Sequence, residues 1–163
     1  MKIVVNPYDK KSIDKAIKEL NQYKDWVQRK ETELRERLAF VGATVASIEF
    51  ARAIYSGTND VSIRVEDNGT KATIIAEGKA VAFIEFGSGA KYGNGHPMND
   101  EFGTGPGTYS DGPNGKGHWN NPKGWYYAPK RHTYGNPPAM AMVHARDAMV
   151  EQLTDIAREV FRK

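Results

Sequence analysis

The sequence predicts an α+β domain with long N-terminal helices, a small antiparallel sheet with a β-hairpin, a long Gly/aromatic loop and a C-terminal helix. Helical periodicity dominates the first third of the chain, two short strand-like segments flank an Asn-Gly turn, and a second helical pattern occupies the C-terminus. A chain of 163 residues can bury a core of its own as a single domain. We expect a helical region (1–57), a hairpin with a short apolar segment (58–86), a long loop (87–124), and a strand followed by the C-terminal helix (125–163).

The helical region is predicted to hold two helices. Ser12 is a suitable N-cap for the first. Apolar residues then recur with helical spacing at Ile13, Ala16, Ile17 and Leu20. No Gly or Pro follows until Gly42, and Gly57 is expected to end the second helix. The second helix is densely charged at first and becomes apolar and alanine-rich from Ala39. This change indicates a helix that emerges from an exposed or intersubunit position into the domain core.

Two strands and a short helix are predicted next. Residues 61–66 alternate apolar and polar side chains, as in a half-buried strand. The pair Asn68 and Gly69 favours a hairpin turn because it tolerates positive φ, and 71–77 supplies the returning strand. The apolar segment 80–84 is compatible with a buried strand or a helical turn, and its alanines favour a short helix.

The C-terminal part combines a strand and a helix. Residues 125–127 (WYY) have the composition of a strand. Pro137 and Pro138 are expected to open the final helix, because proline is tolerated in a helix's first turn, and the helix is expected to continue to about Arg162. Its apolar stripe comprises Ala139, Met142, Val143, Met149, Leu153, Ile156 and Val160.

Between Phe86 and Trp125 the sequence shows no pattern of a helix or a long strand. Ten of the 16 glycines lie between Gly87 and Gly117, yet the segment also carries aromatic residues, which an inert linker lacks. So long a loop in a compact domain is usually functional or disordered, and Trp and Tyr are common interface anchors. We therefore expect the loop to order against a protein partner. The candidate interface residues are Tyr92, Phe102, Tyr109, Trp119, Trp125 and Tyr126.

No catalytic, cofactor-binding or metal-binding residue is identified, and we predict no cofactor. The glycine clusters of the loop resemble a phosphate loop, but Ser110 and Gly117 stand where a Walker A motif has Gly and Ser or Thr. The flanking strand and helix of that motif are also missing from the sequence pattern. His96, His118 and His132 lack paired metal-ligand spacing, and the chain has no cysteine.

Glu85 is the strongest candidate for acid–base chemistry, because a carboxylate in an apolar segment needs a stabilising partner. Capping of the 87–89 turn, or pairing with a Lys or Arg, is the simpler explanation. Two functional alternatives stay open. One is a small hydrolase that uses Glu85 with His96 or His118. The other is a carbohydrate- or nucleic-acid-binding module that uses loop aromatics, namely Trp119, Trp125 and Tyr126.

The charge pattern disfavours a dedicated nucleic-acid binder. The net charge is +3, with 23 Lys and Arg against 20 Asp and Glu, and the two signs are interspersed along the chain. A nucleic-acid-binding domain usually carries a basic stripe instead. Neither a signal peptide nor an apolar run of about 20 residues is visible. A soluble, cytosolic protein is therefore expected.

Three motifs follow one another in a distinctive order. They are Phe83-Ile84-Glu85-Phe86-Gly87-Ser88-Gly89, then Gly124-Trp125-Tyr126-Tyr127, then the Gly-x-Pro-Ala segment from Gly135 to Met140. Together with the helical region, the hairpin and the C-terminal helix, they make the chain resemble the head–tail joining family of long-tailed bacteriophages. Members of this family are also described as tail-completion, neck or minor structural proteins. The motif residues singled out here are Glu85, Phe86, Gly87, Gly89, Pro137 and Pro138.

The resemblance implies a structural phage or prophage virion protein that is not an enzyme. It implies a homo-oligomeric ring, a hexamer in the virion, placed between the head connector and the tail and in contact with other neck and tail proteins. DNA would pass through the lumen as non-specific cargo, and no membrane, catalytic residue or cofactor is implied. The expected location is the head–tail interface of the virion, and the host cytoplasm during assembly.

Overall fold

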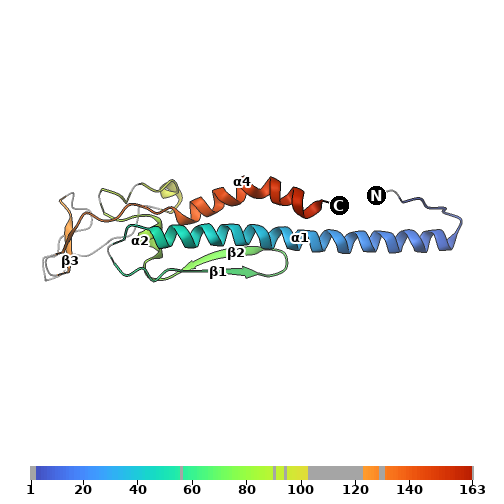
Figure 1. Ribbon diagram of the computed structural model, residues 1–163, viewed down its shortest axis with the longest axis horizontal. Coiled ribbons are helices and arrows are strands. Elements are labelled where there is room, and N and C mark those ends of the chain that lie inside the picture. Colours follow the sequence, from blue (N-terminus) through green and yellow to red (C-terminus); the bar gives the residue numbers. More distant parts are fainter. Residues whose placement is uncertain are drawn as a thin grey trace.

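The computed structural model describes residues 3–55, 57–89, 91–93, 95–102, 123–128 and 131–162. As the sequence predicts, the fold is α+β. Its helices are α1 (Lys10–Arg52), α2 (Val81–Glu85), α3 (Asn99–Phe102) and α4 (Ala141–Phe161). Its strands form two antiparallel pairs, β1 (Ser62–Asp67) with β2 (Ala72–Glu77) and β3 (Trp125–Ala128) with β4 (Arg131–Thr133). The described part is elongated along α1, with α4 on one side of this helix and the β1–β2 hairpin on another (Figure 1).

Helix α1 is one continuous helix of 43 residues, so the prediction of two helices is wrong. No residue in the sequence forces a break. Gly42 is tolerated inside the helix because it is buried where Ile74 and Met149 approach, and the Met149 sulfur would lie only 2.7 Å from a Cβ at this position. The N-cap is Asp9, whose side chain accepts a hydrogen bond from the Lys11 N–H at 3.0 Å.

Both ends of α1 differ from the prediction. Ser12 is not the N-cap but lies inside the first turn, where its hydroxyl accepts a hydrogen bond from a backbone N–H of the preceding segment. The helix ends at Arg52 and not at Gly57. Near this end the Asn59 side chain donates to the Phe50 carbonyl oxygen at 2.8 Å, which satisfies an acceptor of the last helical turn.

The predicted hairpin and the short helix after it are confirmed. Strands β1 and β2 pair with Asp67 opposite Ala72. Between the strands, the Asn68 side-chain oxygen accepts hydrogen bonds from two backbone N–H groups of the turn, at 2.8 and 3.0 Å. A 2.9 Å salt bridge from Arg35 of α1 fixes the turn end of the hairpin to that helix, and this hydrogen bond lowers the pKa of the Asp67 carboxyl. Helix α2 occupies the segment predicted at 80–84.

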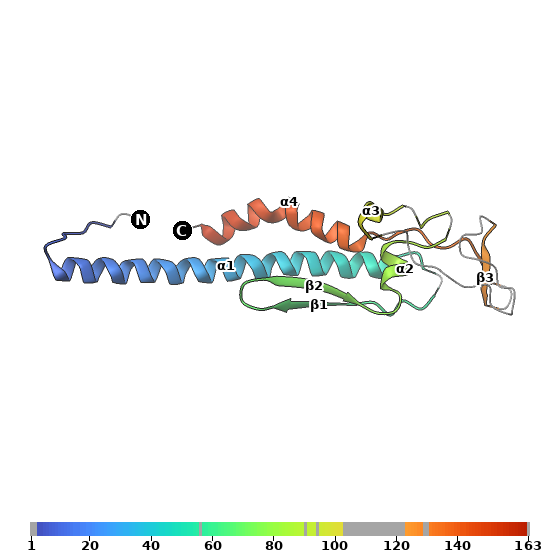
Figure 2. The same ribbon diagram turned by 180° about the vertical axis from the view of Figure 1, so that it is seen from behind.

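Helix α4 runs antiparallel to α1 and covers only part of it (Figure 2). Met149, in the middle of α4, approaches Gly42 of α1. At the other end, the Phe161 ring meets the Trp26 ring edge-on, with the centroids 5.9 Å apart. The part of α1 before Trp26 therefore extends beyond the end of α4.

The start of α4 corrects another prediction, because Pro137 and Pro138 precede the helix and do not open it. The backbone after them is held by α2: the Ala139 N–H donates to the Ile84 carbonyl oxygen at 2.8 Å. Helical geometry starts only after Met140, the N-cap, which has a left-handed φ of 54°. Contacts with another element thus move the helix start by several residues.

Two short elements, α3 and β4, were not predicted from the sequence. Helix α3 lies in the stretch from Phe86 to Trp125 that was expected to hold no helix, so that expectation is wrong at Asn99–Phe102. A single turn of this length is too short to show periodicity in the sequence. The strand predicted at 125–127 is confirmed as β3, and its partner β4 is an addition.

The core lies where the C-terminal half of α1 meets α2 and the first turns of α4. Its buried residues are Ala46, Phe50, Ala80, Ile84, Ala141 and Ala145. Because four of the six are alanines, these elements approach one another closely. In the described part of the chain, only Ile84 and Val160 are large side chains less than 2% exposed. The N-terminal half of α1 lies outside this small core.

Candidate functional site

Two of the three sequence motifs meet in space. The segment Phe83–Gly89, which includes the end of α2, packs against the segment Gly135–Met140, which leads into α4. We call this contact the motif junction. Ser88 donates to Asn136 twice: its N–H to the carbonyl oxygen at 3.0 Å and its hydroxyl to Oδ1 at 2.6 Å. The Asn136 side-chain amide in turn donates to the Phe83 carbonyl oxygen at 2.8 Å. Ser88 and Asn136 are both buried.

Two motif glycines allow the backbones to approach this closely. Gly87 and Gly135 have φ angles of 76° and 98°, which residues with a side chain rarely adopt. A Cβ on Gly135 would collide with the Ser88 carbonyl group, and a Cβ on Gly87 would lie 2.8 Å from the Pro138 nitrogen. Close backbone contact therefore explains why glycine stands at these two motif positions.

Glu85 caps the N-terminus of α4. Its two carboxylate oxygens lie 3.2 and 3.1 Å from the Met142 nitrogen, which belongs to the first turn of that helix. The helix's own N-cap, Met140, has no side-chain oxygen that can do this. Glu85 thus places a carboxylate, from α2, where unpaired N–H groups and the helix dipole favour a negative charge. The expected capping of the 87–89 turn is therefore wrong.

The second partner of Glu85 is His96, and not the Lys or Arg that was expected. His96 Nε2 lies 3.2 Å from Glu85 Oε1, and its Nδ1 accepts a hydrogen bond from the Met98 N–H at 3.1 Å. Because Nδ1 is an acceptor, the proton of the neutral imidazole lies on Nε2, which donates to the carboxylate. The Phe86 ring packs against the imidazole, with the centroids 4.4 Å apart.

The Glu85–His96 pair brings together two of the three residues considered for a hydrolase, and His118 lies outside the described residues. Both side chains are almost inaccessible, 6% exposed for Glu85 and 2% for His96. Both carboxylate oxygens and both ring nitrogens already have a partner within the chain. The pair therefore links α2, the segment around His96 and α4, and its polar atoms bond to one another and to the backbone.

Asp60 fixes the start of α2 in a similar way. Its carboxylate accepts hydrogen bonds from the N–H groups of Lys79 and Ala80, each at 2.9 Å. These two bonds lower the pKa of Asp60. Ala80 is the N-cap of α2 and has no side-chain oxygen, so the cap again comes from elsewhere in the chain. Sequence reasoning missed Asp60 because a capping box is recognised only between residues three apart.

The loop aromatics expected at a protein interface are placed only in part. Tyr92 is half-buried. Phe102 belongs to α3, and Trp125 and Tyr126 belong to β3, but their side chains are outside the described part of the structure. Two further candidates lie outside the described residues altogether, Tyr109 and Trp119. The interface role of all six residues stays a prediction.

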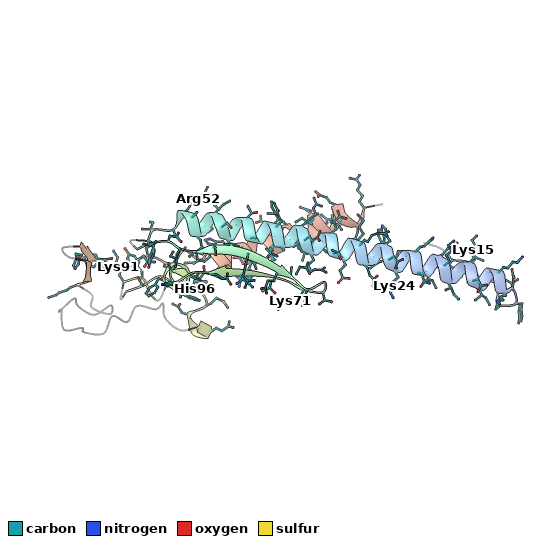
Figure 3. All side chains as sticks on the ribbon, turned by 90° about the horizontal axis from the view of Figure 1, so that it is seen from below. Lys15, Lys24, Arg52, Lys71, Lys91 and His96 are labelled. Carbon is teal, nitrogen blue, oxygen red and sulfur yellow. The ribbon has the colours of Figure 1, made fainter. Side chains whose placement is uncertain are left out.

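An apolar stripe lies near the N-terminus of α1, on residues that were predicted to form the first of two helices. Ile13, Ile17 and Leu20 share one face of the helix and are 37%, 52% and 54% exposed. We call these three residues the α1 stripe. Figure 3 shows Lys15 and Lys24 on this part of the helix, beyond the reach of α4 and of the hairpin.

A groove lies between residues 36–41 of α1 and residues 152–159 of α4. Its volume is about 640 Å³. Phe40, Val41 and Ile156 provide its apolar surface, and Phe40 is 72% exposed. We call it the α1–α4 groove. Charged residues also line it, namely Glu36, Arg37, Asp155 and Glu159.

Among the described residues, no three His, Asp or Glu side chains are grouped as a metal ion requires. None of the described helices has the length and apolarity for a bilayer crossing. Comparisons with protein-family models, with curated proteins and with solved structures found no match to this chain. What the chain does is therefore inferred from its own residues and geometry.

Proposed function

We propose that this chain is a structural protein that joins the head connector of a phage or prophage virion to the tail, by ring assembly and not by catalysis. The observation that carries the proposal is the exposed N-terminal part of α1. It projects beyond α4 and the hairpin and displays the apolar α1 stripe to solvent. Contiguous exposed apolar residues mark contact sites for other proteins. A helix of this kind is suited to contacting a neighbouring subunit.

The motif junction also supports this proposal, because it is built from the segments that carry the resemblance. The segments Phe83–Gly89 and Gly135–Met140 carry much of the resemblance to phage head–tail joining proteins, and they build one structural unit around Glu85. Its polar groups hold α2, His96 and the start of α4 in place. Such a network suits a protein that works by keeping a fixed shape within an assembly.

In this proposal the main partner is the chain itself, in a homo-oligomeric ring that is a hexamer in the virion. Other neck and tail proteins contact the ring, and the loop aromatics are the candidate anchors for such contacts. DNA passes through the lumen without its sequence being read, which agrees with the interspersed charges of the chain. The protein acts at the head–tail interface after assembly in the host cytoplasm.

Deletion of the gene from the phage or prophage that carries it tests the proposal. We expect induced lysates to contain DNA-filled heads and separate tails with few joined particles, counted by negative-stain electron microscopy. Supplying the chain from a plasmid is expected to restore joined particles. A normal number of joined particles without the gene would overturn the proposed function.

A further inference from the structure

We infer that copies of this chain associate head to tail, with the α1 stripe of one copy seated in the α1–α4 groove of the next. This inference rests on the proposed function for the identity of the partner, a second copy of the same chain. It goes further by naming the two surfaces that form the contact, and by giving them different positions on the molecule.

The two surfaces cannot meet within one molecule. Ile17 and Phe40 lie on the same unbroken helix, about 35 Å apart along its axis at 1.5 Å per residue. A continuous helix does not fold back on itself, and α4 ends near Trp26, short of the α1 stripe. The stripe therefore stays exposed in the single chain, and only another molecule can bring a groove to it.

The shapes of the two surfaces match. The α1 stripe is a row of branched apolar side chains on a helix, spaced so that they share one face. The α1–α4 groove lies between two antiparallel helices and exposes Phe40 beside Val41 and Ile156. Side chains of one helix pack into the space between others in this manner, as in helix bundles. Burial in the groove would cover both the stripe and the exposed Phe40 ring.

The charges around the two surfaces are also complementary. Four lysines and two carboxylates lie between Lys10 and Leu20. The groove carries three carboxylates and one guanidinium, Arg37. Arg37 already pairs with Glu159 at 2.9 Å and Asp155 pairs with Arg158 at 3.0 Å, whereas Glu36 has no salt bridge within the described residues. A lysine-rich helix approaching a groove edged with carboxylates gains favourable electrostatic steering and orientation.

The difference between the two surfaces determines what can be assembled. When each subunit contributes a different surface to a contact, successive copies form a ring if the rotation between them closes. A contact of stripe with stripe would instead use the same surface on both subunits and stop at a dimer. The stripe-to-groove contact is therefore the arrangement compatible with the proposed ring.

Substitutions on the two surfaces test the inference in the full-length chain. The stripe variant is Ile17→Asp, the groove variant is Phe40→Asp, and the control is Val150→Asp on α4, which is 66% exposed and lines neither surface. All three place an aspartate at an exposed position of a helix, so their effects on folding are matched, and far-UV circular dichroism checks that the helices are retained. We expect the wild type and the control to form oligomers in mass photometry and analytical ultracentrifugation. Each surface variant is expected to raise the dissociation constant at least about tenfold, because it removes a buried apolar side chain from the contact.

Mixing the two surface variants separates the inferred contact from other arrangements. The stripe variant keeps an intact groove and the groove variant keeps an intact stripe, so an equimolar mixture is expected to form one-to-one heterodimers that neither variant forms alone. If stripe packs against stripe, the groove variant will assemble like the wild type and mixing will add nothing. That result, or unchanged assembly of the stripe variant, would overturn the inference. Wild type that stays monomeric up to about 100 μM, far above ordinary dissociation constants of stable complexes, would also overturn it.

A separate experiment, complementation of the deletion phage, distinguishes failure of the inferred contact from failure of the proposed function. If Ile17→Asp restores joined particles to the deletion phage as well as the wild type does, the inferred contact is wrong and the proposed function stands. If deletion of the gene leaves joined particles at normal numbers, the proposed function fails whatever the association measurements show.

Discussion

Removal of the Glu85 carboxylate is expected to destabilise the whole fold. Glu85→Ala leaves two donors without an acceptor, the part-buried Met142 N–H at the start of α4 and the buried Nε2–H of His96. A buried donor that loses its partner costs about 1–3 kcal/mol. For the two donors together we expect a loss of about 4 kcal/mol in the free energy of unfolding, which corresponds to about 10 °C in Tm for a chain of this length.

Urea unfolding followed by far-UV circular dichroism measures this loss. Glu85→Gln keeps the size of the side chain and one acceptor oxygen, so its loss is expected to be about half as large. Glu151→Ala, at an exposed position of α4, is the control and is expected to change the free energy of unfolding by less than about 0.5 kcal/mol. The double variant of Glu85 and His96 is expected to show a coupling energy of about 0.5–3 kcal/mol, because the two side chains are in contact.

The opposite result would refute the reasoning. Carboxylates at active sites are often held at a cost to stability, so their removal commonly leaves a protein as stable or makes it more stable. If Glu85→Ala unfolds at the same urea concentration as the wild type or a higher one, Glu85 is not the cap of α4 in solution. The hydrolase alternative, with Glu85 and His96 as its acid–base pair, would then gain support.

Three further predictions concern the motif junction, the α2 cap and the exposed helix. Gly135→Ala is expected to lower the free energy of unfolding by more than about 2 kcal/mol, because it adds a clash with the Ser88 carbonyl to an unfavourable φ. Gly69→Ala, also at positive φ but with open space around it, is the control, and equal losses for both would show that the close contact is unimportant. Asp60 has a lowered pKa in the folded chain, so its stabilising effect is present above its ordinary pKa and is lost as the pH falls through the lowered one. Asp60→Asn is therefore expected to lower the urea midpoint at about pH 7 and to match the wild type at about pH 2, and a difference that persists in acid contradicts the capping role. In hydrogen exchange, backbone amides of residues 10–25 are expected to exchange faster than those of residues 39–50 in the monomer and to become protected on assembly, whereas unchanged rates would show that assembly leaves α1 uncovered.

Local sequence patterns predicted the helical character of α1, α2 and α4 and the β1–β2 hairpin, although not the ends of the helices. The stretch from Lys10 to Arg52 contains helical spacing and only one glycine, so its helical character is visible in the sequence. The turn between β1 and β2 forms because the Asn68 side chain bonds to backbone groups two and three residues later. The predicted transition to an alanine-rich helix at Ala39 corresponds to the start of the buried positions in the C-terminal half of α1, namely Ala39, Gly42, Ala46 and Phe50.

The tertiary structure alone decided the partners of buried polar groups and the ends of helices. Glu85 bonds to His96 and to Met142, which lies 57 residues further along the chain. Which N–H group needs an acceptor depends on how α2 and α4 pack, and no local spacing encodes that. The same holds for Pro137 and Pro138, which are kept out of α4 because α2 binds the backbone beside them.

The α1 stripe shows most clearly what the local sequence determines and what the tertiary structure decides. Its spacing determines a helix with an apolar face, and the same spacing is found in a helix that is covered by its own domain. Only the packed structure shows that α4 ends near Trp26 and leaves Ile17 and Leu20 exposed. The sequence thus determined the apolar face of the helix through local periodicity, and the tertiary structure decided that this face stays uncovered because coverage depends on where distant segments end.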